Sequence, residues 1–394
     1  MRKTVTARQK CLLSSLIYQH TCSFAALSIP PLLPLLSMEL GLTAGQAGLI
    51  MFSLYLATAI TALPSGFLVD LFRERFLVVF SVGMLSLGLL VMSFAADFAT
   101  AFVAAFVMGI GYSVSGPLST KMVALVFEGK ERATALGVKQ TGTSSGSALA
   151  SFILPPIAAI TARSSAFISS AAIALATIPL ILYSYVSPGK VKSKTNERFL
   201  RTVLSRSTVT FLLGAFGLGF SIFAMLTHLP LFLTRDVGFS VVEAGFVLAV
   251  VNFFSVLGRI GLGVLADRFF VAKRTAVLLL SSAVAVAASA IFVVSVGIEP
   301  FMSLFPLALL GFFLFGSIGV VFTVGSELVD GGKVGATSGM TYFCLALGNA
   351  TGPLIFGQIA DVFGYWSAWR LYLLFVGLCT LSFFFSWHLG KKIS

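Results

Sequence analysis

Twelve apolar stretches, most of them longer than about 20 residues, run through this chain of 394 residues. A stretch of that length crosses the hydrocarbon core of a bilayer as an α-helix, and it is twice as long as a strand of a membrane barrel. The stretches also lack the alternation of apolar and polar residues that barrel strands show. The sequence therefore predicts an all-α membrane protein with twelve transmembrane helices. The expected spans are residues 11–36, 46–69, 76–95, 100–126, 133–161, 166–186, 207–233, 241–266, 275–297, 301–328, 335–361 and 367–389.

Composition excludes most other classes of protein. Only 10% of the residues are charged and 58% are apolar, whereas a soluble domain carries about 25% charged residues. So few charges cannot cover a water-soluble surface, which excludes a soluble enzyme, a nucleic-acid-binding module and a disordered chain. The four cysteines form no CxxC pair, so neither a disulfide framework nor a metal site is expected.

The positions of lysine and arginine predict the orientation of the chain. Most of the 26 basic residues fall on one side of the expected helices, and only Arg163, Arg235 and Arg370 fall on the other. Because basic residues gather in cytoplasmic loops, we expect a multi-pass protein of the plasma (inner) membrane with both termini cytoplasmic. The net charge of +12 is then a topology signal rather than a sign of nucleic-acid binding. We also expect the first apolar run to be a retained helix rather than a signal peptide, because it continues past Leu35.

The two halves of the chain look like copies of each other. A polar stretch separates them, which predicts an N-terminal bundle of six helices (1–186), a cytoplasmic linker (187–206) and a C-terminal bundle of six helices (207–394). Small residues recur every four positions in spans five and eleven, a spacing that lets helix backbones approach closely in lipid. They are Gly142, Gly146 and Ala150 in the first half and Cys344, Gly348 and Gly352 in the second.

The loop after span two carries a recognisable motif. Gly66-Phe-Leu-Val-Asp70-Leu-Phe-Arg73-Glu-Arg75 resembles the loop signature of the major facilitator superfamily, and Gly263-Val-Leu-Ala-Asp267-Arg268 resembles its repeat in the second half. The resemblance covers essentially the whole chain. It implies two pseudo-symmetric six-helix bundles, rocker-switch alternating access and a cavity lined by spans one, four, seven and ten. Arg73 replaces the second glycine of the signature, and Gly146 is followed by serine where many antiporters of the family carry proline.

The charges of this signature suggest a conformational latch. A carboxylate at a cytoplasmic helix end can bind neighbouring helix N-termini and arginines, and such contacts can form in one transport state and break in the other. The alternative is a plain topology signal with a helix cap. The candidate latch residues are Gly66, Asp70, Arg73, Arg75, Gly263, Asp267 and Arg268.

Charged residues inside the spans are candidates for function, because a charge in the membrane interior is costly. Lys139 leads a polar stripe of span five that continues with Thr143, and we predict that both bind substrate. The alternative for Lys139 is snorkelling of its long stem to the interface. For Lys121 we favour snorkelling, and for Arg259 a structural anchor.

Further polar residues within the spans are candidates for the cavity, with packing or hydrogen bonding as the alternative for each. They are Gln19, His20, His228, Tyr342 and Asn349. His20 could also exchange a coupling proton near neutral pH.

The buried charges are positive, and no carboxylate lies at mid-depth in the first six spans, which favours an organic anion as substrate. We therefore predict a secondary transporter of a small solute, not an enzyme, with efflux of amphipathic drugs as the alternative.

A distant alternative is an intramembrane serine hydrolase, because Ser144 fits the G-x-S-x-G pattern. No Walker A sequence is present, and no cofactor or metal is expected. The expected partners are the solute, membrane lipid and a coupling proton, the protein acting as a monomer without nucleic acid.

Overall fold

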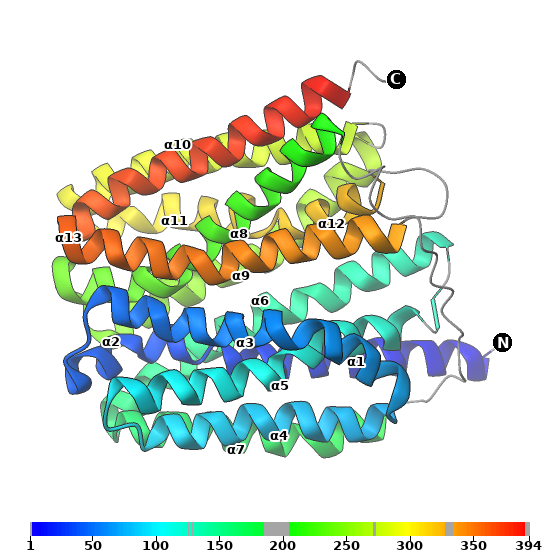
Figure 1. Cartoon of the computed structure of the whole chain (residues 1–394), viewed down its shortest axis with the longest axis horizontal. Coiled ribbons are helices and arrows are strands. Elements are labelled where there is room, and N and C mark those ends of the chain that lie inside the picture. Colours follow the sequence, from blue (N-terminus) through cyan, green and yellow to red (C-terminus); the bar gives the residue numbers. More distant parts are fainter. Residues whose placement is uncertain are drawn as a thin grey trace. The chain divides into compact units, whose positions relative to one another are not determined.

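The structure is a computed structural model, and it describes residues 2–124, 126–127, 129–184, 205–270, 273–327 and 334–390. All regular elements among these residues are helical (Figure 1). The elements are α1 (Arg2–Ala26), α2 (Ile29–Leu40), α3 (Ala44–Leu71), α4 (Glu74–Ser93), α5 (Phe98–Ala124), α6 (Gly129–Ile160), α7 (Arg163–Ser184), α8 (Arg206–Phe232), η1 (Leu233–Val237), α9 (Val241–Phe269), α10 (Arg274–Ile298), η3 (Pro300–Ser303), α11 (Leu304–Leu310), η4 (Gly311–Phe315), α12 (Ile318–Glu327) and α13 (Val334–Gly390).

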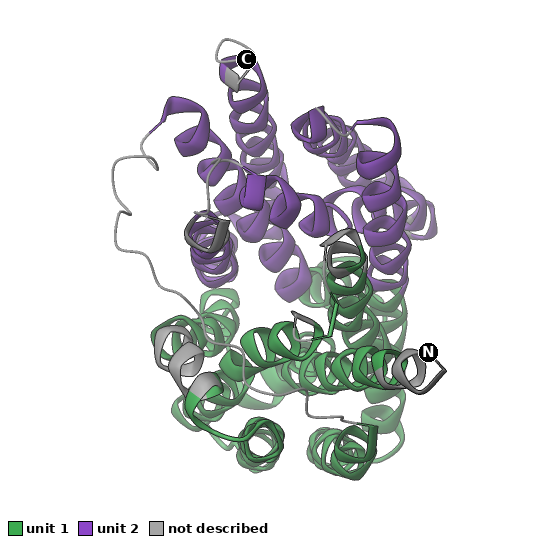
Figure 2. Ribbon diagram, turned by 90° about the vertical axis from the view of Figure 1, so that its right-hand side faces the viewer, with its two compact units in different colours: residues 1–192, 229–249 green, residues 193–228, 250–394 purple. Residues whose placement is uncertain are grey.

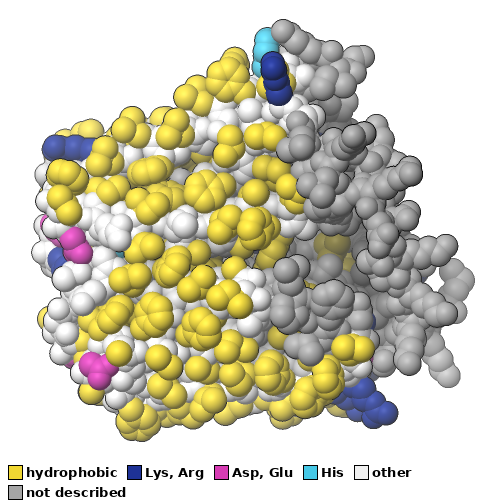
Figure 3. Space-filling view, viewed as in Figure 1, with side chains coloured by type: hydrophobic (Ala, Val, Ile, Leu, Met, Phe, Trp, Pro, Cys, Tyr) yellow, Lys and Arg dark blue, Asp and Glu magenta, His cyan; other side chains and the backbone are white. Residues whose placement is uncertain are grey.

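The predicted fold class, twelve transmembrane helices, is confirmed. Within the described residues, 11 helical segments are long and apolar enough to cross a membrane. The last of them holds two of the expected spans, because Gly364 (φ 77°, ψ 160°) breaks the helical geometry inside α13. Glycine tolerates a positive φ because it has no Cβ atom. Hydrophobic side chains cover much of the face shown in Figure 3, as expected for a surface in contact with lipid.

Two of the expected spans are interrupted. The first span turns at residues 27 and 28, between α1 and α2. Pro30 and Pro31 lie in the first turn of α2, and proline cannot donate the backbone hydrogen bond that would continue α1 through this point. The tenth span is divided by the π-helical segment η4 and a turn at residues 316 and 317.

The chain forms two compact units (Figure 2). One comprises residues 1–192 and 229–249, and the other residues 193–228 and 250–394, so that both α8 and α9 contribute to each unit. Of the predicted linker, 187–206, only the last two residues are described. The bundle limits inferred from the sequence therefore stay predictions.

Close packing at the small residues of span five is confirmed in the first unit. A Cβ atom on Gly146 would lie 2.4 Å from the carbonyl oxygen of His20, and one on Gly142 would lie 3.0 Å from the backbone nitrogen of the same residue. A side chain at Gly146 would therefore push α6 away from α1.

The second unit repeats this arrangement between α13 and α8. A Cβ atom on Gly348 would lie 2.1 Å from the carbonyl oxygen of Phe216, and one on Gly352 would lie 2.3 Å from that of Phe220. Small residues thus bring two helix backbones together in each unit, as the spacing predicts.

A helix cap is also repeated. The hydroxyl of Thr43 accepts a hydrogen bond from the backbone nitrogen of Gln46, whose side chain accepts one from the backbone nitrogen of Thr43. Ser240 and Glu243 form the same reciprocal pair at the start of α9. These capping boxes fix where α3 and α9 begin.

Candidate functional site

Three hydrogen bonds join five polar side chains of α1, α5 and α6 in the first unit, and we call this group the polar ring. Lys139 Nζ donates to Thr120 Oγ1 at 3.2 Å, Ser119 Oγ donates to Gln19 Oε1 at 2.9 Å, and Gln19 Nε2 donates to Thr143 Oγ1 at 3.3 Å. Ser119 and Thr120 are neighbours in α5, while Lys139 and Thr143 stand one turn apart on α6. The ring therefore joins three helices.

Burial distinguishes the two sides of the polar ring. Gln19 and Lys139 are each only 4% exposed, and Ser119 is fully buried. Thr120 and Thr143 are half-buried. Thr120 and Thr143 are therefore the more exposed members of the polar ring.

His20 lies outside the polar ring, although it follows Gln19 in the chain. His20 Nδ1 is 2.8 Å from Ser145 Oγ. Ser145 stands two residues from Thr143, about 200° around α6, and shares its stripe with the exposed side chains of Leu149 and Phe152. Gln19 and His20 thus contact opposite sides of α6.

His228 lies in an aromatic cluster of the second unit and is fully buried. Its Nε2 is 2.8 Å from the carbonyl oxygen of Pro353, its Nδ1 is 3.3 Å from the Tyr365 hydroxyl, and its ring stacks on Phe356. If Nε2 donates to the carbonyl, Nδ1 is the acceptor for Tyr365. The contacts of His228 thus tie α8 to both parts of α13.

Tyr342 and Asn349 occupy different surroundings on α13. Tyr342 is 38% exposed, and its ring stacks on Phe322 of α12. Asn349 is half-buried beside Gly219 of α8, where a Cβ atom would lie 2.7 Å from Asn349 Oδ1. Of these two candidates, Tyr342 has the more accessible side chain.

Ion pairs join helix ends in both units. Lys121 Nζ lies 3.2 Å from Glu74 Oε1 and also donates to the carbonyl of Val69. In the second unit Arg274 pairs with Asp267 at 2.9 Å and with Glu327. Lys121 of α5 therefore pairs with a carboxylate of the protein. The snorkelling expected from the sequence would place its ammonium group at the interface without such a partner.

The other candidate latch residues make fewer contacts that the structure describes. Arg73, Arg75 and Arg268 are exposed, and Gly263 has open space around its Cα. Gly66 and Asp70 lie near the end of α3, and the surroundings of Gly66 and the side chain of Asp70 are outside what the structure describes.

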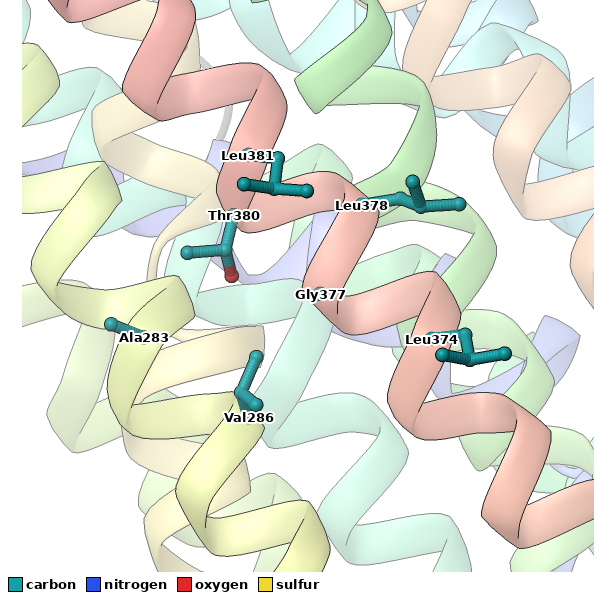
Figure 4. A pocket seen from close by; sticks show the side chains of 7 residues that line it. All are labelled: Ala283, Val286, Leu374, Gly377, Leu378, Thr380 and Leu381. Carbon is teal, nitrogen blue, oxygen red and sulfur yellow. The ribbon is translucent and has the colours of Figure 1, made fainter.

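A cavity of about 590 Å³ lies between α10 and α13 in the second unit (Figure 4). Its lining is apolar apart from Thr380, whose hydroxyl donates to the carbonyl of Val376. The lining offers no charge to a polar solute, and it resembles a surface for lipid chains.

Neither a nucleophile elbow nor a metal centre is visible in the described part of the chain. Ser144 lies in the middle of α6, whereas the elbow requires a strand followed by a turn and a helix. No three acidic, histidine or cysteine side chains among the described residues could hold a metal ion.

Ser119, Thr120 and Ser145 are the residues that sequence reasoning missed. Their only signal is the polar run Ser113-Val-Ser-Gly-Pro-Leu-Ser119-Thr120 in span four and the serines of span five. Serine often bonds a carbonyl of its own helix, so the run alone did not single out a site.

Comparison with known proteins gives a consistent result. The family model described as Major Facilitator Superfamily matches residues 16–353. The chain is 29% identical to the uncharacterized MFS-type transporter YfnC of Bacillus subtilis, over 85% of this chain and 83% of that protein. It is 27% identical to the hexuronate transporter of the same species (91% and 88%). It is 24% identical to the probable sulfoacetate transporter SauU of Cupriavidus necator (83% and 81%).

A solved structure supports the fold. The crystal structure of a bacterial homologue of the human lysosomal transporter Spinster, in an inward-facing and occupied conformation, matches with a TM-score of 0.76. The match covers 95% of this chain and 96% of that one at 15% sequence identity.

Proposed function

Because the chain belongs to the major facilitator superfamily, we propose that it is a secondary active transporter that moves a small organic anion across the plasma membrane. Rocker-switch alternating access between two six-helix bundles (1–186 and 207–394) is the proposed mechanism. The proposed orientation has both termini in the cytoplasm, following the bias of lysine and arginine.

Lys139 in the polar ring is the observation that carries this proposal. A buried ammonium group in a membrane protein is costly and is associated with substrate pathways. Lys139 is only 4% exposed, and its Nζ donates to the Thr120 hydroxyl at 3.2 Å. The names of two relatives, a hexuronate transporter and a probable sulfoacetate transporter, also favour an anion.

Uptake of radiolabelled D-glucuronate, D-galacturonate and sulfoacetate into proteoliposomes tests the proposal. In Lys139→Gln we expect KM for the transported anion to rise at least about tenfold, since a hydrogen bond to a charged group contributes about 1.5–3 kcal/mol. Lys139→Arg should retain part of the affinity, because arginine keeps the charge and changes the geometry.

Lys121→Gln is the matched control, since it neutralises a second lysine of the same unit that already has a carboxylate partner. We expect it to slow uptake and to leave KM unchanged. If the wild-type protein transported hydrophobic cations and none of the three anions, the result would contradict the proposed substrate class and favour drug efflux.

A further inference from the structure

The hydrogen bonds of the polar ring have a direction, and this direction defines what the ring can bind. Lysine only donates hydrogen bonds, so Thr120 must accept from Lys139 through its oxygen. The Thr120 hydroxyl proton has no acceptor among the described residues and remains available to a ligand. Thr120 therefore stands beside the ammonium group as a second donor.

Gln19 has the same effect on Thr143. The Gln19 amide is oriented with its oxygen toward Ser119, whose hydroxyl also lies within hydrogen-bond distance of the Ser115 carbonyl. In this orientation the amide nitrogen donates to Thr143 and to Ser23, each at 3.3 Å. With this amide orientation Thr143 accepts through its oxygen, and its proton also has no acceptor in the described part of the chain. Gln19 is itself buried and its amide is engaged at both ends, so it acts on a ligand through Thr143.

We propose that the polar ring is a donor-only oxyanion site, in which the Thr120 and Thr143 hydroxyls donate to a carboxylate or sulfonate beside Lys139. The half-buried threonines are the groups that touch the ligand, and Gln19 is a positioning residue. This inference rests on the proposed function and extends it to the ionisation state of the substrate.

A donor-only site discriminates by chemistry rather than by size. Each oxygen of a carboxylate or sulfonate is an acceptor, so every donor of the site finds a partner. An amide of the same shape would turn N–H groups toward these donors, and unpaired polar groups would remain on both sides. We therefore expect the site to reject the uncharged amide of an anion that it binds.

Threonine-to-valine variants test the two hydroxyls, because valine keeps the shape and removes the donor. We expect Thr120→Val and Thr143→Val each to raise KM for the transported anion about tenfold, with thermal stability retained. Thr120→Ser and Thr143→Ser should stay within about threefold of wild type, because each keeps the hydroxyl. Thr177→Val is the control, since Thr177 pairs with Thr21 outside the ring.

A second readout is selectivity. Wild type should prefer D-glucuronate to D-glucuronamide, measured as competition against labelled anion uptake and as a ligand-induced shift in melting temperature. The preference for D-glucuronate over D-glucuronamide should become smaller in Thr120→Val and in Thr143→Val. Each valine removes a hydroxyl donor, and an N–H group of the amide cannot pair with such a donor.

Gln19→Met tests the positioning role. It should raise KM in the wild-type background and have no further effect in Thr143→Val, since Gln19 acts through Thr143. If the amide oxygen and nitrogen of Gln19 were exchanged, Thr143 would donate its proton to the amide oxygen. Thr143→Val would then leave KM unchanged.

The outcomes separate this inference from the function on which it rests. Unchanged KM in both valine variants, with a raised KM in Lys139→Gln, would overturn the donor-only site and leave anion transport standing. Equal competition by D-glucuronate and D-glucuronamide would overturn it as well. Wild-type transport of none of the three anions would overturn both proposals.

Discussion

At the residue scale, the neighbouring residues Gln19 and His20 of α1 contact different partners. Gln19 bonds Ser119 and Thr143 within the polar ring, whereas His20 bonds Ser145 on the far side of α6. Histidine exchanges a proton near neutral pH, and a proton carrier need not touch the substrate. We therefore propose that the binding and proton-coupling roles are divided between these two residues.

His20→Gln tests this division in proteoliposomes with an imposed pH gradient. We expect the stimulation of uptake by the gradient to disappear, because glutamine cannot carry the proton. The KM for the anion at equal pH should change by less than about twofold, since His20 makes no hydrogen bond to the ring. A mutant that still responds to the gradient would exclude His20 as the proton carrier.

The sequence predicts part of this site and misses part of it for physical reasons. Lys139 and Thr143 are four residues apart on one helix, so their shared face follows from helix geometry alone. Thr120 contributes only through its contact with another helix, which no local pattern reveals. The direction in which His20 points depends on how α1 is rotated against α6, and the sequence does not specify that rotation.

At the element scale, glycines set the distance between the helices that carry the ring. Gly146 brings α6 against the backbone of α1 at His20, and a shift of α6 would move Lys139 and Thr143 relative to Gln19. The four-residue spacing predicts this contact correctly. The interruption of the tenth span was missed, because the π-helical segment Gly311–Phe315 contains no proline and is apolar throughout.

Gly146→Ala should disturb both packing and binding. The added Cβ atom would lie 2.4 Å from a backbone oxygen of α1, and overpacking of this kind costs about 1–3 kcal/mol. We expect a lower melting temperature in detergent and a raised KM for the anion. Gly137→Ala is the control in the same helix, because nothing lies within 4 Å of its Cβ position. Equal melting temperatures for the two variants would contradict the packing argument.

At the scale of the whole molecule, each unit repeats the same devices with different chemistry. Both contain a close helix contact at glycines, and both hold an ion pair between the start of one helix and the end of another. The ion pair has opposite polarity in the two units: Glu74 with Lys121 in the first, and Arg274 with Glu327 in the second. In each, the cation has a further acceptor, the carbonyl of Val69 or the carboxylate of Asp267.

We propose that these ion pairs belong to the conformational latch inferred from the loop signature. Their position at helix ends lets them form and break as a bundle moves, without contact with the solute. A latch changes the rate of interconversion between states, whereas a binding residue changes affinity. Uptake kinetics therefore distinguish the latch from the polar ring, since the former alters the maximal rate and the latter alters KM.

A double-mutant cycle on Glu74 and Lys121 tests the latch in the first unit. Glu74→Gln and Lys121→Gln should each lower the maximal uptake rate at unchanged KM, because each removes one charge of the pair. The double variant should be no slower than the slower single variant, since the remaining charge has no partner left to lose. In melting experiments we expect a coupling energy of about 0.5–1 kcal/mol, the upper range for pairs near a surface. Strictly additive losses in rate would show that the two side chains act independently, and wild-type rates in both single variants would leave the pair with a purely structural role.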